Sequence, residues 1–274
     1  MIRLAFVTQP RLHIASAGAG TPVVLLHGLT ATLRYVVMGS RALERSGHHV
    51  VAYDARGHGS SDPAPHQREY EYADLAADLL RVMDGAGIRR AVLAGASMGA
   101  HTALRVALEH PDRVLGLVVI TPAYDPDLHA DAVSLARWDA LSEGLRRGGV
   151  EGFIAAYGEP DVPQAWRATL LTVLRQRLAA HEHPEAVADA LRVVPRSRPF
   201  DALDDLAQID VPVAIVADRD EPDPGHPLAI GEAYAARIPG AQLVVEEPGR
   251  SPIAWQGGQL SKVIAQIAAA AERG

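Results

Sequence analysis

The chain contains no cysteine among its 274 residues. This absence excludes a disulfide framework, a thiol nucleophile and any metal or iron–sulfur site held by cysteine. Basic residues are also in the minority, with 26 Lys and Arg against 33 Asp and Glu and a formal net charge of −7. An acidic chain without a block of basic residues is not expected to have nucleic acid as its main partner.

Long apolar runs are missing as well. No stretch reaches the roughly 18 apolar residues that a membrane-spanning helix needs, so no membrane partner is expected. Pro10 and Arg11 end the first apolar stretch well short of a secretory signal, which predicts a cytoplasmic protein. His181 and His183 lack the spacing that places two ligands on one helical face, so neither a metal nor another cofactor is expected. The expected partner is a small-molecule substrate, and the expected assembly is a monomer or a homodimer.

Short apolar runs, by contrast, are frequent, and 48% of the residues are hydrophobic. At about 150 residues per domain, the length predicts one large domain or one domain with an insertion. The runs alternate with segments of helical periodicity, which predicts an α/β fold around a mostly parallel central sheet. Because the runs lack polar alternation, their strands are expected to be covered on both faces. The expected strands are 23–26, 49–53, 91–94, 114–120, 211–217 and 242–245, with an antiparallel edge strand at 12–15, and the expected helices are 72–86, 99–110, 227–238 and 255–272.

Residues 124–207 interrupt this alternation. The segment has no convincing strand, and its periodicity indicates helices at 135–147, 149–157, 165–181 and 185–193. We therefore expect a helical insertion at 124–207 within a core formed by residues 1–123 and 208–274. Trp138 is the aromatic residue of this insertion that we expect to line a binding pocket.

The strongest chemical signal is Gly95-Ala96-Ser97-Met98-Gly99. The motif has the pattern G-x-S-x-G and lies between an expected strand and an expected helix, which is the context that a nucleophile elbow requires. A sharp turn there would lift the Ser97 hydroxyl above the edge of the sheet, at the positive end of a helix dipole. The alternative is a glycine-rich turn with an ordinary serine.

The loop His27-Gly28-Leu29-Thr30 follows the first expected core strand. The backbone N–H of Leu29, paired with the N–H of Met98, could hold the negatively charged oxygen of a tetrahedral intermediate. For His27 we favour a role in bracing this loop over a catalytic one.

A third motif, Asp54-Ala55-Arg56-Gly57-His58-Gly59-Ser60-Ser61, follows the next expected strand. With the two motifs above, in this order and spacing, the chain resembles the α/β-hydrolase superfamily, in its cap-bearing esterase and lactonase-like branch. The resemblance covers nearly the whole chain. It implies a structural role for the Asp54 segment, and it implies that the helical insertion is a cap over the pocket.

The resemblance also implies the order Ser, acid, His for the catalytic residues. After the expected strand at 211–217, the family's Gly-x-Asp-x-Pro pattern places the acid at Asp220. Asp218, in the usual glycine position, is the second candidate. A cluster of turn-forming residues at the surface is the alternative for this segment.

The family's histidine is missing from its usual place after the last strand, where this chain has Gly249-Arg250. Arginine stays protonated and cannot accept the serine proton at neutral pH. A relocated base is one explanation, and His226, six residues after Asp220, is the candidate. Chemistry that needs no such base is another, with Arg250 binding a substrate carboxylate or stabilising an anion. The third is a scaffold without catalytic activity.

We therefore predict a serine hydrolase that acts on a small carboxylic ester, lactone or thioester through an acyl-enzyme at Ser97. Asp220 and His226 would complete the catalytic residues. Two alternatives stay open at this point: a non-hydrolytic enzyme, such as a lyase or a cyclisation catalyst using Arg250, and an inactive ligand-binding scaffold.

Overall fold

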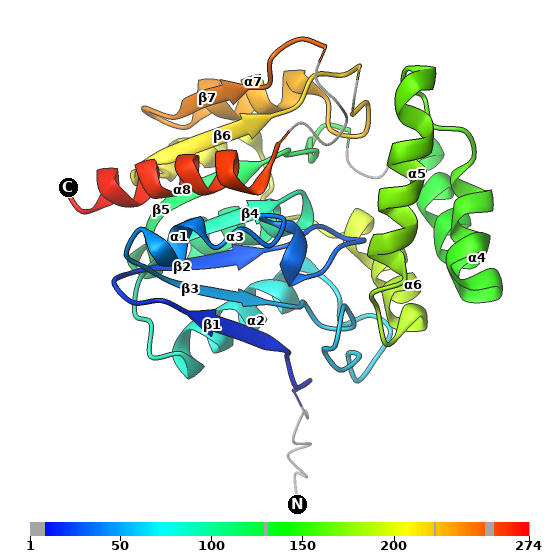
Figure 1. The fold of residues 1–274 in the computed structure, drawn as a ribbon, viewed down its shortest axis with the longest axis horizontal. Coiled ribbons are helices and arrows are strands. Elements are labelled where there is room, and N and C mark those ends of the chain that lie inside the picture. The colour runs from blue at the N-terminus through cyan, green and yellow to red at the C-terminus, as the bar shows by residue number, and fades with distance from the viewer. Residues whose placement is uncertain (1–8, 129–130, 222, 250–254, 274) are drawn as a thin grey trace, which may run out of the picture.

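The computed structural model describes residues 9–128, 131–221, 223–249 and 255–273, and they form a seven-stranded sheet flanked by helices (Figure 1). The strand order is β1-β3-β2-β4-β5-β6-β7, and every neighbouring pair is parallel except β1 with β3. The predicted α/β fold with a mostly parallel sheet is therefore confirmed. The strands are β1 (Ile14–Ala17), β2 (Thr21–Leu26), β3 (His48–Tyr53), β4 (Ala91–Ala96), β5 (Val114–Ile120), β6 (Val213–Ala217) and β7 (Gln242–Val245).

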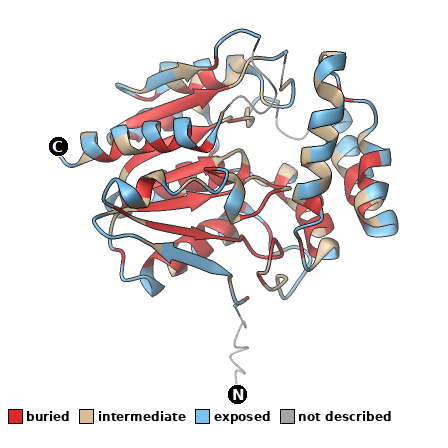
Figure 2. Ribbon diagram, in the orientation of Figure 1, coloured by how far each residue is buried: buried red, intermediate tan, exposed pale blue. Residues whose placement is uncertain are grey.

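The centre of the sheet is buried, as expected for strands covered on both faces (Figure 2). Side chains alternate along each strand, so that Val24 and Leu26 face one helical layer while Val23 and Leu25 face the other. The prediction of full coverage is wrong for β7, whose residues are exposed or half-buried because the strand forms the edge of the sheet.

Helices cover both faces. One face packs against α2 (Tyr72–Gly85), α3 (Met98–Glu109) and α7 (Leu228–Arg237). The other face packs against α1 (Ala42–Arg45) and α8 (Gly257–Ala271). None of the described helices is both long enough and apolar enough to cross a membrane.

Three helices come between β5 and β6: α4 (Ala132–Tyr157, kinked at Gly149), α5 (Gln164–Leu178) and α6 (Pro184–Val193). They lie beyond the edge of the sheet toward which the parallel strands run (Figure 1). Their apolar side chains share one buried cluster with residues of the core loops. A polar contact adds to this packing, because the His181 Nδ1 accepts the Gly59 N–H at 2.9 Å. All three helices fall within 124–207, while the division of the chain into core and insertion stays a prediction.

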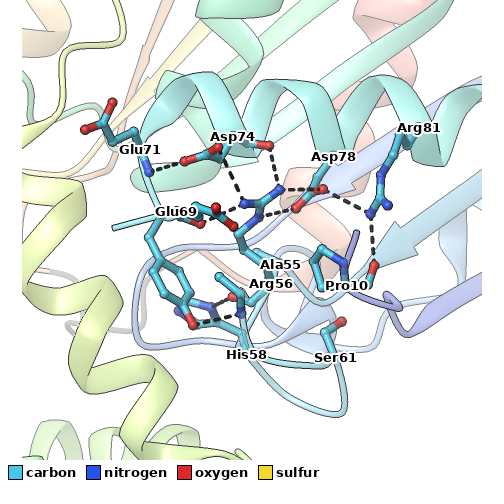
Figure 3. Close-up of polar contacts among 12 residues, drawn as sticks. Pro10, Ala55, Arg56, His58, Ser61, Glu69, Glu71, Asp74, Asp78 and Arg81 are labelled. Carbon is cyan, nitrogen blue, oxygen red and sulfur yellow. Dashed lines mark hydrogen bonds and ion pairs between the residues drawn. The ribbon is translucent and has the colours of Figure 1, made fainter. Parts of the chain in front are cut away.

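The Asp54–Ser61 segment is anchored through Arg56, whose side chain is only 3% exposed (Figure 3). Its guanidinium donates to both carboxylate oxygens of Asp78 on α2, with N–O distances of 2.7 and 2.9 Å. It also donates to the backbone carbonyls of Glu69 and Asp74. Every nitrogen of this buried cation therefore has an acceptor, which is the condition for burying a charge.

Candidate active site

Ser97 stands between β4 and α3 with a backbone conformation that serine rarely adopts, φ 50° and ψ −113°. Such a residue costs about 1–3 kcal/mol and persists only when its surroundings fix it. Its N–H donates to the Ile120 carbonyl at the end of β5, and its carbonyl accepts the His101 N–H within α3. The serine side chain is half-buried at the carboxyl edge of the sheet.

The two glycines of the motif allow this turn. A Cβ on Gly99 would lie 2.3 Å from the Leu26 carbonyl oxygen, and a Cβ on Gly95 would lie 2.3 Å from the Gly99 carbonyl. Both distances are far below van der Waals contact, so larger side chains would push α3 away from β2 and β4. The G-x-S-x-G pattern thus reports close packing as well as chemistry.

His226 is the side chain that the structure brings to Ser97. The His226 Nε2 lies 3.0 Å from the Ser97 Oγ, although the two residues are 129 positions apart. On the other side of the ring, the His226 Nδ1 lies 2.7 Å from the Asp223 Oδ2. Both side chains of this ion pair are about three-quarters buried, with 26% and 30% exposed. The three groups form a serine–imidazole–carboxylate chain, the arrangement that activates a serine.

Local electrostatics favour a charged imidazole beside a charged carboxylate. Burial disfavours the imidazolium, but the carboxylates of Asp223 and Asp218 outweigh it, so that the pKa of His226 is raised. Burial likewise opposes ionisation of Asp223, yet the neighbouring imidazole keeps the pKa of this carboxyl below its usual range. The pair is therefore suited to take up a proton from Ser97 and to stabilise the resulting charge.

Asp220 is not the carboxylate beside the histidine, which corrects the alignment on the family pattern. Its Oδ1 accepts the Leu228 N–H at 2.7 Å, at the first residue of α7, and its side chain is exposed. The carboxylate that contacts His226 is three residues later, at Asp223. The sequence Asp223-Pro224-Gly225-His226 forms a β-turn in which the His226 N–H donates to the Asp223 carbonyl. Because residues i and i+3 of such a turn lie side by side, the Pro-Gly pair was the available signal for this carboxylate.

Asp218 and Glu246 lie behind the pair, at the ends of β6 and β7. Burial, with the charges of Asp223 and Glu246, raises the pKa of Asp218 to about 7. The Glu246 Oε1 accepts the Arg219 N–H at 2.8 Å, and burial raises the pKa of this glutamic acid as well. Asp218 is thus a titratable neighbour of the acid position.

The loop after β2 lies directly against Ser97. A Cβ on Gly28 would lie 3.5 Å from the Ser97 Cβ. The His27 Nδ1 and the Ala31 N–H both lie within hydrogen-bonding distance of the Gly28 carbonyl, at 2.8 and 3.0 Å. The Leu29 N–H belongs to the same planar peptide and so points the opposite way.

His27 accordingly braces this loop, since its Nε2 accepts the Ala55 N–H at 2.9 Å. Neither the Leu29 N–H nor the Met98 N–H donates to any residue that the structure describes. Two free donors on either side of the serine fit an oxyanion-binding role, which stays a prediction.

Two further predicted residues are less informative. Arg250 falls outside the described residues. Trp138 is half-buried on α4 and packs against the apolar cluster shared by the three inserted helices and the core loops, so its substrate-binding role stays a prediction. The described residues contain no group of three or more His, Asp or Glu side chains arranged to hold a metal ion.

Comparison with known proteins gives a consistent picture. A family model described as alpha/beta hydrolase fold matches residues 21–200. A protein of Caulobacter vibrioides named as a candidate carbamate hydrolase, RutD, is 31% identical over 266 residues, which are 94% of this chain and 92% of that protein. A candidate non-heme haloperoxidase of Mycobacterium phage D29 is 33% identical over 133 residues, 48% of this chain, and the match spans only 46% of that relative. The solved structure of a thermophilic esterase from Thermogutta terrifontis matches with a TM-score of 0.75 at 26% identity, covering 98% of this chain and 95% of that one.

Proposed function

Because this chain belongs to the family of the α/β-hydrolase fold, we propose that it is a serine hydrolase that cleaves a small carboxylic ester, lactone or thioester. The observation that supports the proposal most directly is the hydrogen-bonded series Ser97 Oγ, His226 Nε2, His226 Nδ1 and Asp223 Oδ2. The names of relatives as an esterase and a candidate carbamate hydrolase agree with hydrolysis at a carbonyl carbon.

In the first half of the reaction, the His226 Nε2 takes the proton from the Ser97 hydroxyl while the Oγ attacks the carbonyl carbon. Negative charge develops on the carbonyl oxygen, and the N–H groups of Leu29 and Met98 would stabilise it. The bond to the leaving oxygen or sulfur then breaks. His226 returns its proton to that atom, which leaves an acyl-enzyme on Ser97.

In the second half, His226 takes a proton from a water molecule, and the hydroxide attacks the acyl carbon. The bond to the Ser97 Oγ breaks, and His226 gives the proton back to the serine. Asp223 holds the imidazole in the tautomer with a proton on Nδ1 and stabilises its charged form in both halves. The net change is the addition of water across one ester, lactone or thioester bond.

The position of α4, α5 and α6 beyond the strand ends supports a further part of the proposal, that these helices act as a cap. They would limit the space above Ser97 and so select the acyl group, with Trp138 among the lining residues. The cytoplasmic location stays a prediction from the sequence.

Labelling with a fluorophosphonate tests the proposal, because this reagent modifies serines activated by a base and an oxyanion site. We expect one adduct by intact-mass analysis, mapped to Ser97 and absent in Ser97→Ala. Loss of labelling in His226→Ala, with retention in His110→Ala as a control, would identify the base. A folded protein that takes up no label would contradict the proposal and favour non-hydrolytic chemistry or a binding scaffold.

A further inference from the structure

A charged side chain of the inserted helices packs on the loop that follows β2. Arg177 lies in the last turn of α5, and its guanidinium carbon is 5.2 Å from the centre of the Tyr35 ring in the loop after β2. This contact joins α5 to the loop after β2, and the same loop contains Gly28, whose added Cβ would lie 3.5 Å from the Ser97 Cβ. Stacking on an aromatic face holds a guanidinium in a fixed plane while leaving its N–H groups available.

Arg177 has no ion pair with any residue that the structure describes. Its Nε is buried and donates to no described acceptor. The residues outside the description contain no Asp or Glu side chain, so the chain has no undescribed acidic residue to pair with it. A half-buried guanidinium without a carboxylate partner is unusual, because the cost of removing its charge from water is not repaid.

Arg175, on the same helix, is an arginine with an acidic partner. Arg175 donates from Nε and Nη2 to the two carboxylate oxygens of Glu151, at 2.8 and 3.0 Å, on the exposed side of α5. The two arginines are two residues apart and therefore face different directions. Arg175 points toward solvent and pairs with Glu151, whereas Arg177 points toward Tyr35 and has no acidic partner among the described residues.

The electrostatic neighbours of Arg177 are those of the active site. Its charge attracts that of Asp223 and opposes the protonation of His226. Asp223 is already engaged by the His226 Nδ1 and lies beyond ion-pair distance of Arg177. Arg177 therefore lies within electrostatic range of Asp223 and His226 without forming an ion pair with Asp223.

We propose that Arg177, stacked on Tyr35, binds a carboxylate carried by the substrate at a distance from the scissile bond. The inference rests on the proposed hydrolase function and narrows its substrate class to esters, lactones or thioesters that bear a second, anionic group. An arginine fork binds a carboxylate through two parallel N–H···O bonds, which are stronger where the guanidinium is partly removed from water. The substrate carboxylate would be the hydrogen-bond acceptor that no described side chain provides for Arg177.

Two nitrophenyl esters of equal length test this selectivity. One is the monoester of adipic acid, and the other carries an acyl chain that ends in an isopropyl group in place of the carboxylate. We expect Arg177→Met to lower kcat/KM for the anionic ester by about tenfold to a hundredfold, the loss typical of a charge-assisted hydrogen-bond pair. The neutral ester should change little. Arg175→Gln is the matched control on the same helix and should leave the ratio of the two substrates unchanged.

A binding measurement separates this inference from the hydrolase proposal. In a Ser97→Ala background, calorimetric titration with adipate should show saturable binding that Arg177→Met weakens by about tenfold or more. The carboxylate subsite would be overturned if Arg177→Met lowered kcat/KM equally for both esters. It would also be overturned if this substitution left the affinity for adipate unchanged. The protein could also bind adipate through Arg177 and cleave neither ester. That result would support the carboxylate subsite and contradict the hydrolase proposal.

Discussion

Arg56 and Arg177 are two arginines in surroundings of opposite kind. Arg56 is buried within the core and is surrounded by acceptors: both oxygens of Asp78 and two backbone carbonyls (Figure 3). Burial disfavours its charge, but the Asp78 carboxylate overcomes this effect, so the pKa of Arg56 is raised. Burial also disfavours the charge of Arg177, and there Tyr35 and Asp223 offset the effect only in part, so the pKa of Arg177 is lowered.

A similar contrast holds between an acidic residue beside Arg56 and one in the candidate active site. Asp78 receives Arg56 and also lies 3.0 Å from a nitrogen of Arg81, so its charge is fully balanced. Asp218, near Asp223, has a buried Oδ1 without a partner in the described chain. Charged groups that are all paired stabilise the fold. Unpaired charged groups can instead bind a substrate or take up a proton.

The largest effect should come from the carboxylate beside the imidazole. Asp223→Asn keeps the shape but offers an amide to the His226 Nδ1, which favours the wrong tautomer, so kcat/KM should fall by about a thousandfold to ten-thousandfold. Steady-state kinetics on a nitrophenyl ester would measure this loss.

Asp220→Asn is the matched control, because Asp220 is exposed and bonds the start of α7. This variant should stay within about twofold of the parent. A loss in Asp220→Asn as large as that in Asp223→Asn would contradict the assignment of the acid.

The next effect concerns stability. Arg56→Met removes the cation and leaves the Asp78 carboxylate buried with only the partly exposed Arg81 beside it, so the free energy of unfolding should fall by about 3–5 kcal/mol. Guanidinium chloride denaturation followed by circular dichroism would measure it. A loss below about 1 kcal/mol would show that water or Arg81 compensates and that the Arg56 cluster is less closed than its contacts indicate.

A smaller effect should appear in the pH dependence of the reaction. Since the base acts in its neutral form and the pKa of His226 is raised, kcat/KM should fall on acidification with a midpoint above the ordinary histidine value of 6.5. Asp218→Asn removes a negative charge that favours the imidazolium, so this midpoint should move to lower pH. Profiles of kcat/KM between pH 5 and 9 would test both statements. A midpoint that does not move would mean that Asp218 acts on neither Asp223 nor His226.

The smallest effect should be on stability, when Arg177 is replaced. Arg177→Met removes an unpaired, half-buried charge and keeps an apolar stem against Tyr35, so the free energy of unfolding should change by less than about 1 kcal/mol. The same denaturation experiment measures it beside Arg56→Met. A loss comparable with that of Arg56→Met would make Arg177 a structural residue that joins α5 to the loop after β2.

Much of this arrangement could be predicted from the sequence. The apolar runs indicated the parallel strands, and the G-x-S-x-G motif indicated the turn at Ser97, because the close packing of Gly95 and Gly99 leaves a local signature. His226 emerged as a candidate base by elimination, once Arg250 was found in the usual histidine position. The family spacing points to Asp220 and not to Asp223, which the Pro-Gly turn holds beside His226.

Local periodicity and close neighbours in the chain are enough to set the order of strands and helices and the serine turn, and the acidic, cysteine-free composition is a property of the sequence alone. Which distant side chains meet depends on tertiary packing. It set the 3.0 Å contact across 129 residues between Ser97 and His226, and it stacked Arg177 on Tyr35. It also left Arg177 unpaired while Arg56 found four acceptor atoms. Such differences depend on burial and on packing between remote segments, which no local pattern encodes.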